Sequence, residues 1–99
     1  MAQFHVYRLR HEQTLVLDLQ SNLLDDLTTR MVAPLLLPGE LTATFRQLNP
    51  QFTIDNIHYV MATQFVSVVA LSDLGHAVAD LTRDSHRVTA ALDFLFQGF

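Results

Sequence analysis

Residues 51–63, QFTIDNIHYVMAT, carry the clearest fold signal in the chain. Apolar residues recur at every second position on both sides of Asp55-Asn56, two residue types that tolerate positive φ. The apolar positions are Phe52 and Ile54 before this pair and Ile57, Tyr59 and Met61 after it. Two alternating runs joined by a tight turn predict a β-hairpin, so we expect an antiparallel sheet.

The segments on either side of this hairpin extend the sheet. Residues 65–71, FVSVVAL, predict one more buried strand, closed by the polar Ser72-Asp73 and by Gly75. Residues 31–37, MVAPLLL, predict a strand in which Pro34 indicates an edge position or a bulge, because proline cannot donate a hydrogen bond to a ladder. Between this strand and the hairpin, residues 38–50 predict an irregular excursion with a turn or two of helix.

The first twenty residues predict a second hairpin. Residues 3–9 alternate strictly between apolar and polar side chains, which is the periodicity of a strand. Residues 10–13 are a polar turn, and the following run alternates again, with leucine at every second position from Leu15 to Leu19. Residues 25–30, DDLTTR, then form a polar connection to the next strand.

The last element is a helix that Asp84 or Ser85 can cap. Its apolar stripe contains Val88, Ala91, Leu92, Leu95 and Phe96, of which Val88, Leu92 and Phe96 are expected in the core. Ala90 and Phe94 lie outside the stripe, so the helix is apolar on two sides and suits a position between its own sheet and another surface. Five or six strands and one helix predict a single α+β domain over residues 1–99, mainly antiparallel β.

Composition excludes several classes of protein. The 99 residues are 49% apolar, carry a net charge of −4, and include neither cysteine nor lysine. Disulfides, cysteine-ligated zinc, thiol catalysis and lysine Schiff bases are therefore excluded. The arginines form no basic patch, so direct binding of nucleic acid is not expected. A chain this small cannot easily bury so many apolar residues alone, which predicts a homodimer.

No local motif points to a metal, a cofactor or a catalytic group. The histidines His5, His11, His58, His76 and His86 form no pair with the spacing of a zinc motif. The glycines do not cluster into a phosphate-binding loop. The sequence also shows no signal peptide at its start and no apolar run long enough to span a bilayer, so we expect a soluble cytoplasmic protein.

Several segments, taken in order, resemble the CcdB family of toxins. The most specific are DLQS at residues 18–21, RMVAPL at residues 30–35, VADL at residues 78–81, and an apolar helix that ends in aromatic-x-Gly-apolar. Each segment alone is a weak signal, but their order across the whole chain favours this family. The resemblance implies a homodimer whose subunit is an SH3-like, partly open barrel with a C-terminal helix.

The resemblance also implies a function by binding, with no catalytic activity and no cofactor. Members of the family are toxins of plasmid or chromosomal CcdA/CcdB-type (type II) toxin–antitoxin pairs. They bind the A subunit of DNA gyrase and trap the enzyme while its DNA is cleaved. A cognate CcdA-like antitoxin neutralises the toxin through a disordered segment that folds on binding.

In this family the gyrase-binding tip matches Gln97, Gly98 and Phe99, presented by the two C-terminal helices of the dimer. A helix is a rigid mount, Gly98 can end it, and an apolar side chain beyond it can anchor an interface. The best-known member has a tryptophan where this chain has Gln97, and glutamine cannot stack on a cation. Phe94 and Leu95 are expected either in the core or at the dimer interface.

The resemblance places the antitoxin on the first hairpin and on the excursion. The matching residues are Arg8, Arg10, His11, Glu12, Thr42, Phe45 and Arg46. Two other hypotheses stay open. One is a MazF-like endoribonuclease that uses an acid, Arg30 and His58, although the lack of a basic stripe counts against it. The other is a non-toxic dimer that has lost gyrase as its target, which the glutamine at position 97 would allow.

Overall fold

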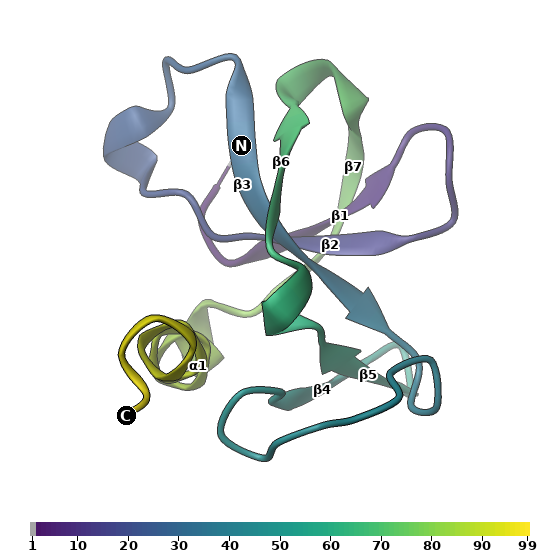
Figure 1. The fold of residues 1–99 in the computed structure, drawn as a ribbon. Helices are drawn as coiled ribbons and strands as arrows, with labels where there is room; N and C mark the ends of the chain where they lie inside the picture. The colour runs from purple at the N-terminus through teal and green to yellow at the C-terminus, as the bar shows by residue number, and fades with distance from the viewer. Residues whose placement is uncertain (1) are drawn as a thin grey trace.

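A single antiparallel sheet curls into a half-barrel, and one α-helix near the C-terminus packs against it (Figure 1). The computed structural model describes residues 2–99. The strands are β1 (His5–Leu9), β2 (Leu15–Asp18), β3 (Thr29–Leu36), β4 (Gln51–Ile54), β5 (Ile57–Met61), β6 (Ser67–Ala70) and β7 (Leu74–Asp80). The helix α1 spans Ser85–Gln97, and the short 3₁₀ helices are η1 (Asn22–Leu24), η2 (Thr63–Phe65), η3 (Leu71–Asp73) and η4 (Thr82–Asp84).

β3 is the strand that holds the sheet together. The strand order is β4-β5-β3-β2-β1-β7, with β6 paired to β3 outside this path. β3 pairs with β2 along one edge, and with β6 and then β5 along the other. This arrangement confirms the predicted α+β fold, an SH3-like partly open barrel with a C-terminal helix.

Both predicted hairpins are present. Asp55 and Asn56 have φ angles of 52° and 65°, and β4 and β5 pair directly across them. A two-residue turn with positive φ at both positions matches the twist of the strands that it joins. In the N-terminal hairpin, Val6 lies opposite Leu17, and both side chains are fully buried.

The excursion predicted at residues 38–50 is present and begins one residue earlier, after Leu36, but it contains no helix. The carbonyl of Phe45 accepts hydrogen bonds from the backbone N–H groups of Leu48 and Asn49, at 3.0 and 2.7 Å, which closes one turn. The buried side chain of Asn49 donates to the carbonyl of Met61, at 2.9 Å. This bond fastens the end of the excursion to β5.

The prediction that Pro34 marks an edge strand or a bulge is wrong. β3 lies inside the sheet, and its register with β2 is unbroken past Pro34. On its other edge, β3 pairs with β6 at residues 29–32 and with β5 at residues 35–36. On this second edge the Pro34 carbonyl accepts a hydrogen bond from the backbone N–H of Ala62. The Pro34 nitrogen points to the same edge, where it faces the gap between β6 and β5. No ladder donor is required there, which is why an interior strand tolerates the proline.

The strand predicted at residues 65–71 is present as β6, but the prediction that it is buried is wrong. β6 covers only part of this run, and the side chains of Phe65 and Val68 are 55% and 59% exposed. The strand that sequence patterning missed is β7, which pairs with β1. Gly75 lies inside β7 and does not close a strand. A Cβ at this position would lie 2.7 Å from the backbone oxygen of Arg8, so only glycine lets the two strands approach so closely.

The main core lies between α1 and the sheet. Val88 and Ala91 of the helix are fully buried and belong to one cluster with Val6 and Leu17 of the sheet. A second, smaller cluster contains Tyr7, Val16, Val32 and Leu74. Adjacent strand residues point to opposite faces, so Val6 and Tyr7 bury both faces of β1.

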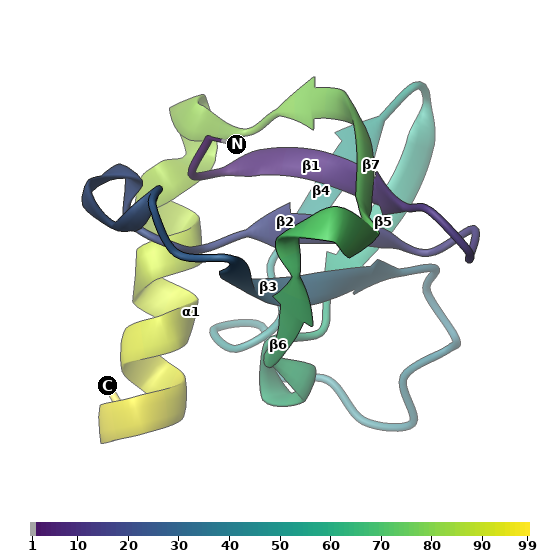
Figure 2. The same cartoon turned by 90° about the horizontal axis from the view of Figure 1, so that it is seen from above.

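The prediction that Phe96 belongs to the core is wrong. Its side chain is 73% exposed. Figure 2 shows that the last turns of α1 extend beyond the strands, so no strand covers this part of the helix. The spacing of apolar residues gives the face of a helix but not the length of sheet beneath it.

Arg30, which sequence patterning places in a polar connection, is 1% exposed. Its Nε and one terminal nitrogen donate to Oδ2 of the buried Asp18, at 3.1 and 2.6 Å, and its other terminal nitrogen donates to Asp25 at 2.9 Å. Burial by itself would lower the pKa of Arg30, but its hydrogen bonds to the two carboxylates raise that pKa above its usual value. The charged group therefore links β2, β3 and the loop between them.

Candidate functional site

The predicted gyrase-binding residues lie at the free end of α1. The helix ends at Gln97, and Gly98 follows in the left-handed conformation with a φ of 82°. The N–H of Gly98 donates to the carbonyl of Phe94 at 2.9 Å, which closes the last turn. A Cβ on Gly98 would meet no atom within 4 Å, so backbone conformation, and not space, favours glycine here.

The side chains around this helix end face the solvent. Phe96 is 73% exposed, Phe99 is 84% exposed, and Gln97 is exposed between them. We call Gln97, Gly98 and Phe99 the C-terminal tip, and Phe96 lies next to it on the last turn of α1. Exposed apolar side chains gathered in one place are typical of an interaction surface. Because the helix end extends beyond the strands in Figure 2, a partner can reach the tip from several directions.

Phe94 and Leu95, the residues predicted for the core or the dimer interface, are both half-buried in the single chain. The main core takes in the neighbouring Leu92, which packs against its buried members. Phe94 and Leu95 therefore keep apolar surface that a second subunit could cover.

The hairpin half of the predicted antitoxin surface lines a hollow of about 660 Å³. Its lining residues are Arg8, Leu9, Arg10, His11, Gly75 and His76, and we call this space the basic hollow. Glu12 lies just beyond it on the hairpin turn, where its carboxylate accepts a hydrogen bond from the Thr14 hydroxyl at 3.3 Å. Sequence patterning missed Gly75 and His76 because they reach the hollow through β7, a strand that it did not predict.

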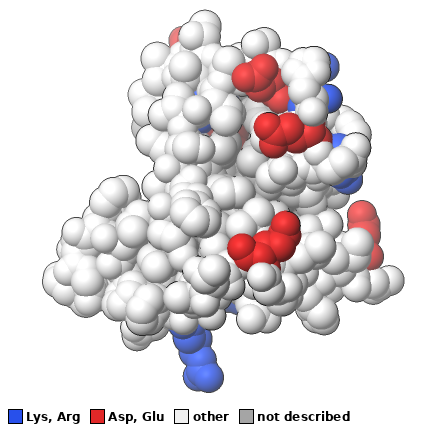
Figure 3. Space-filling model, turned by 45° about the vertical axis from the view of Figure 1, so that its right-hand side comes forward, with Lys and Arg blue, Asp and Glu red and all other residues white. Residues whose placement is uncertain are grey.

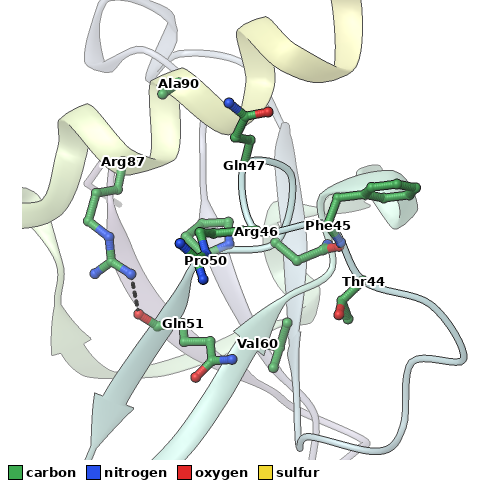
Figure 4. A pocket seen from close by; sticks show the side chains of 10 residues that line it. Thr44, Phe45, Arg46, Gln47, Pro50, Gln51, Val60, Arg87 and Ala90 are labelled. Atoms are coloured by element: carbon green, nitrogen blue, oxygen red, sulfur yellow. Dashed lines mark hydrogen bonds between the residues drawn. The ribbon is translucent and has the colours of Figure 1, made fainter. Parts of the chain in front are cut away.

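The excursion half lines a second hollow, between the excursion and α1 (Figure 4). Phe45, which is 61% exposed, and Arg46 lie on one side of it. Arg87 of α1 lies on another side, where it donates to the backbone oxygen of Gln51 at 2.6 Å. Its guanidinium carbon also lies 4.8 Å from the centre of the Phe52 ring. Arg87 was not predicted, because only the folded chain brings this helix beside β4.

The two halves do not form one continuous pocket. The two hollows share no lining residue, and Thr42 lines neither, although it is exposed on the excursion. In Figure 1 the turn between β1 and β2 projects from one side of the molecule and the excursion from another. A partner that contacts all the predicted residues must therefore extend from one hollow to the other.

The residues required by the ribonuclease hypothesis belong to separate clusters. Arg30 is buried against Asp18, whereas His58 is exposed on β5 and its ring is hydrogen-bonded to the Thr53 hydroxyl at 2.9 Å. Among residues 2–99, no group of three His, Cys, Asp or Glu side chains could hold a metal ion. In the same part of the chain, no helix has the length and apolarity needed to cross a membrane.

The charged side chains are spread thinly over the surface. On the face drawn in Figure 3 most atoms are uncharged, acidic side chains gather beside basic atoms at the upper right, and the other acidic side chains lie farther apart. The chain carries ten acidic residues and six arginines. Such a face does not resemble the positive stripe that tracks a nucleic-acid backbone.

Comparison with known protein families gives a match to the family described as CcdB protein over residues 3–98. The matched region contains the whole sheet, both hollows, and α1 with Gly98 beyond it. It also contains three of the four segments that carry the resemblance in the sequence, and all of the fourth except its last residue, Phe99. The chain therefore belongs to the CcdB family.

Proposed function

We propose that this chain is a cytoplasmic toxin that acts as a homodimer, binds the A subunit of DNA gyrase and traps the complex of gyrase with cleaved DNA. Membership of the CcdB family supports a toxin of a toxin–antitoxin system. The observation that carries the gyrase proposal is the C-terminal tip, an exposed apolar end on a rigid helix. In this proposal the toxin acts by binding, without catalysis and without a cofactor.

The geometry of the tip supports a role as an anchor. The hydrogen bond from Gly98 to Phe94 fixes the direction in which the chain leaves the helix, and therefore limits where Phe99 can lie. A backbone direction fixed in this way reduces the conformational entropy that the tip loses when it binds. In a homodimer two such tips can engage one partner, and the second contact then forms within an existing complex.

Gln97 sets the chemistry at the centre of the tip. Its amide can donate and accept hydrogen bonds, but it offers no ring face to a cation. We infer that Phe96 and Phe99, which are 73% and 84% exposed, provide the apolar part of the contact. A tryptophan at position 97 would add an aromatic face without disturbing packed atoms, because the position is exposed.

We propose that a CcdA-like antitoxin neutralises the toxin through an extended segment. The predicted contact residues line two separate hollows, and an extended chain can reach both without a single deep pocket. A segment that is disordered when free can wrap such a surface as it folds. The tip would then remain a distinct surface, reserved for gyrase.

Deletion of residues 97–99 tests the gyrase proposal. The deleted residues lie beyond the buried turns of α1, so the fold is expected to survive, whereas gyrase binding is expected to be lost. The measurements are affinity for the A subunit of gyrase and the linear DNA that accumulates when gyrase and supercoiled plasmid are incubated with the protein. Gln97→Trp should instead tighten binding by about 1 kcal/mol or more if the ring meets a cation.

Phe65→Ala is the matched control for the tip, because Phe65 is an exposed phenylalanine on η2. It should leave both gyrase measurements unchanged. A truncated protein that binds gyrase with the same affinity as the intact chain would contradict the proposal. If the intact protein neither binds gyrase nor arrests cell growth, the chain is a non-toxic dimer, and RNA cleavage by the intact protein would instead favour the ribonuclease.

A further inference from the structure

A third hollow opens where β5 leaves β3. The two strands pair at Leu35 with Met61 and at Leu36 with Val60, whereas the first residues of β5 pair with β4. Figure 1 shows β3 running into the excursion beside β4 and β5. The space between these elements has a volume of about 400 Å³. We call it the leucine hollow, because four leucines line it, Leu15, Leu35, Leu36 and Leu37.

The leucine hollow has an apolar floor and an open rim. Leu15 and Leu35 are buried beneath it, whereas Leu37 and Ile57 are exposed at its edge. Tyr59 of β5 is half-buried and adds an aromatic ring to the lining. Apolar and aromatic walls around a few polar groups are typical of a small-molecule site, and this volume lies at the small end of the range for such sites.

A tight turn at residues 37–40 holds a carboxylate at this rim. Pro38 and a φ of 98° at Gly39 are typical of the two central positions of a type II turn. The backbone N–H of Glu40 donates to the Leu37 carbonyl at 3.0 Å, and one carboxylate oxygen of Glu40 accepts from the Leu37 N–H at 2.6 Å. The side chain is therefore oriented before a ligand arrives, and its second oxygen can face a cation.

Glu40 differs from the other acidic residues in its place beside this floor. Within residues 2–99, the carboxylates that form ion pairs belong to Asp18, Asp25, Asp80 and Asp84. Of the remaining acidic residues in this range, Glu40 alone lines any of the three hollows, and it is the one charged residue that lines the leucine hollow. One fixed carboxylate above an apolar floor matches a ligand with one positive end and an apolar body.

We propose that the leucine hollow binds a small organic cation, an alkylammonium whose charged group pairs with Glu40 and whose chain covers the leucines of the floor. An ammonium group donates charge-assisted hydrogen bonds to a carboxylate, and the Tyr59 ring can add a cation–π contact. The chain is stabilised because each of its methylene groups leaves water. This site goes beyond the proposed function, since the leucine hollow shares no lining residue with the other two hollows or with the C-terminal tip.

A small cation fits the leucine hollow better than a basic segment of a protein does. Several carboxylates along a track would match a row of lysines or arginines, whereas this hollow presents one carboxylate among the described residues. Its floor is also closed by buried side chains, so an apolar chain that enters from the rim ends against Leu15 and Leu35.

Titration with simple amines tests this inference. The probes are hexylammonium, butylammonium and the neutral hexanol, each added at neutral pH to isotope-labelled protein whose backbone amide chemical shifts are followed by NMR. Hexylammonium should shift the amides of the leucine hollow in a saturable way. Hexanol should bind about tenfold more weakly, because it cannot pair with the carboxylate. Butylammonium should also bind about tenfold more weakly, because two fewer methylene groups leave water.

Glu40→Gln removes the charge and keeps an oxygen that can accept the Leu37 N–H, so the turn is expected to survive. It should weaken hexylammonium binding about tenfold or more and leave hexanol binding unchanged. Asp93→Asn is the matched control, because Asp93 is an exposed carboxylate of α1 that does not line the hollow. The control removes the same charge and should leave the affinity for hexylammonium unchanged.

Several results would overturn the inference. One is hexanol that binds the original chain as tightly as hexylammonium, a comparison that holds even if Glu40→Gln does not fold. Another is a folded Glu40→Gln variant that keeps the full affinity for hexylammonium. Shifts that spread over the surface without saturation would show non-specific association. A capped lysine peptide that shifts the same amides at lower concentration than hexylammonium would assign the hollow to a protein segment instead.

The amine titration does not depend on gyrase. The deletion of residues 97–99 removes the tip and leaves the leucine hollow intact, so it should not change the affinity for hexylammonium. A chain that binds hexylammonium at the hollow but never binds gyrase contradicts the proposed function and supports this inference. A chain that binds gyrase but shows no saturable shifts with hexylammonium overturns this inference and leaves the proposed function standing.

Discussion

Asp18 and Arg30 form the most deeply buried ion pair among the described residues, at 0% and 1% exposure of their side chains. Removing one partner of a buried pair leaves the other charge without compensation in a low-dielectric interior. We therefore expect Asp18→Asn, which keeps the shape of the side chain, to lower the free energy of unfolding by about 3–5 kcal/mol. Urea denaturation followed by circular dichroism measures this change.

Asp26→Asn is the control for this prediction, because Asp26 is a nearby exposed carboxylate. It should change the free energy of unfolding by less than about 0.5 kcal/mol. If both variants unfold at the same urea concentration, the buried pair does not contribute to stability. The sequence could not predict this pair, since the two residues lie in different segments and alternation says nothing about which polar side chains meet.

Gly75 determines how two elements, β1 and β7, fit together. A methyl group at this position would lie 2.7 Å from the carbonyl oxygen of Arg8, and backbone atoms cannot move aside as a flexible side chain does. Gly75→Ala should therefore lower the free energy of unfolding by about 1–3 kcal/mol, the usual cost of overpacking. Ser67→Ala, at an exposed position of β6, should be close to neutral in the same urea experiment. If Gly75→Ala is as stable as the original chain, β1 and β7 can move apart at this position without lowering the free energy of unfolding.

The elements differ in how far sequence alone predicts them. The hairpin at residues 51–61 is specified locally, because its turn residues and its alternation lie within one short run. β7 has no such signal, since its pairing with β1 joins segments about seventy residues apart along the chain. The apolar stripe of α1 predicts Val88 and Ala91 correctly, but Phe96 lies beyond the part of the helix that packs on the sheet. Family resemblance predicts the C-terminal tip, but only the structure shows that its side chains are exposed.

The whole molecule has a larger solvent-accessible surface than a folded monomer of its mass ordinarily has. A folded monomer of 11.2 kDa ordinarily exposes about 5,700 Å², whereas this chain exposes 6105 Å². Large apolar side chains contribute to this surface at several places, including Leu23 of η1, which is 94% exposed, and two of these places are candidates for a dimer interface. One is the last turns of α1, and the other is the pair Met31 and Val68, which face each other across β3 and β6 and are 40% and 59% exposed.

These two surfaces lead to different dimers, and a pair of substitutions separates them. We expect a homodimer at micromolar concentration whose interface includes α1, because Phe94 and Leu95 flank the helix face that packs on the core. Leu95→Glu should then give monomers, because it would bury an unpaired charge in the interface. Val68→Glu, on β6, should leave the dimer intact. Sedimentation velocity reports both outcomes, and circular dichroism confirms that each variant is folded. If Val68→Glu gives monomers and Leu95→Glu does not, the dimer interface lies on β3 and β6 instead of α1. If the original chain sediments only as an 11.2 kDa species, the prediction of a dimer is contradicted.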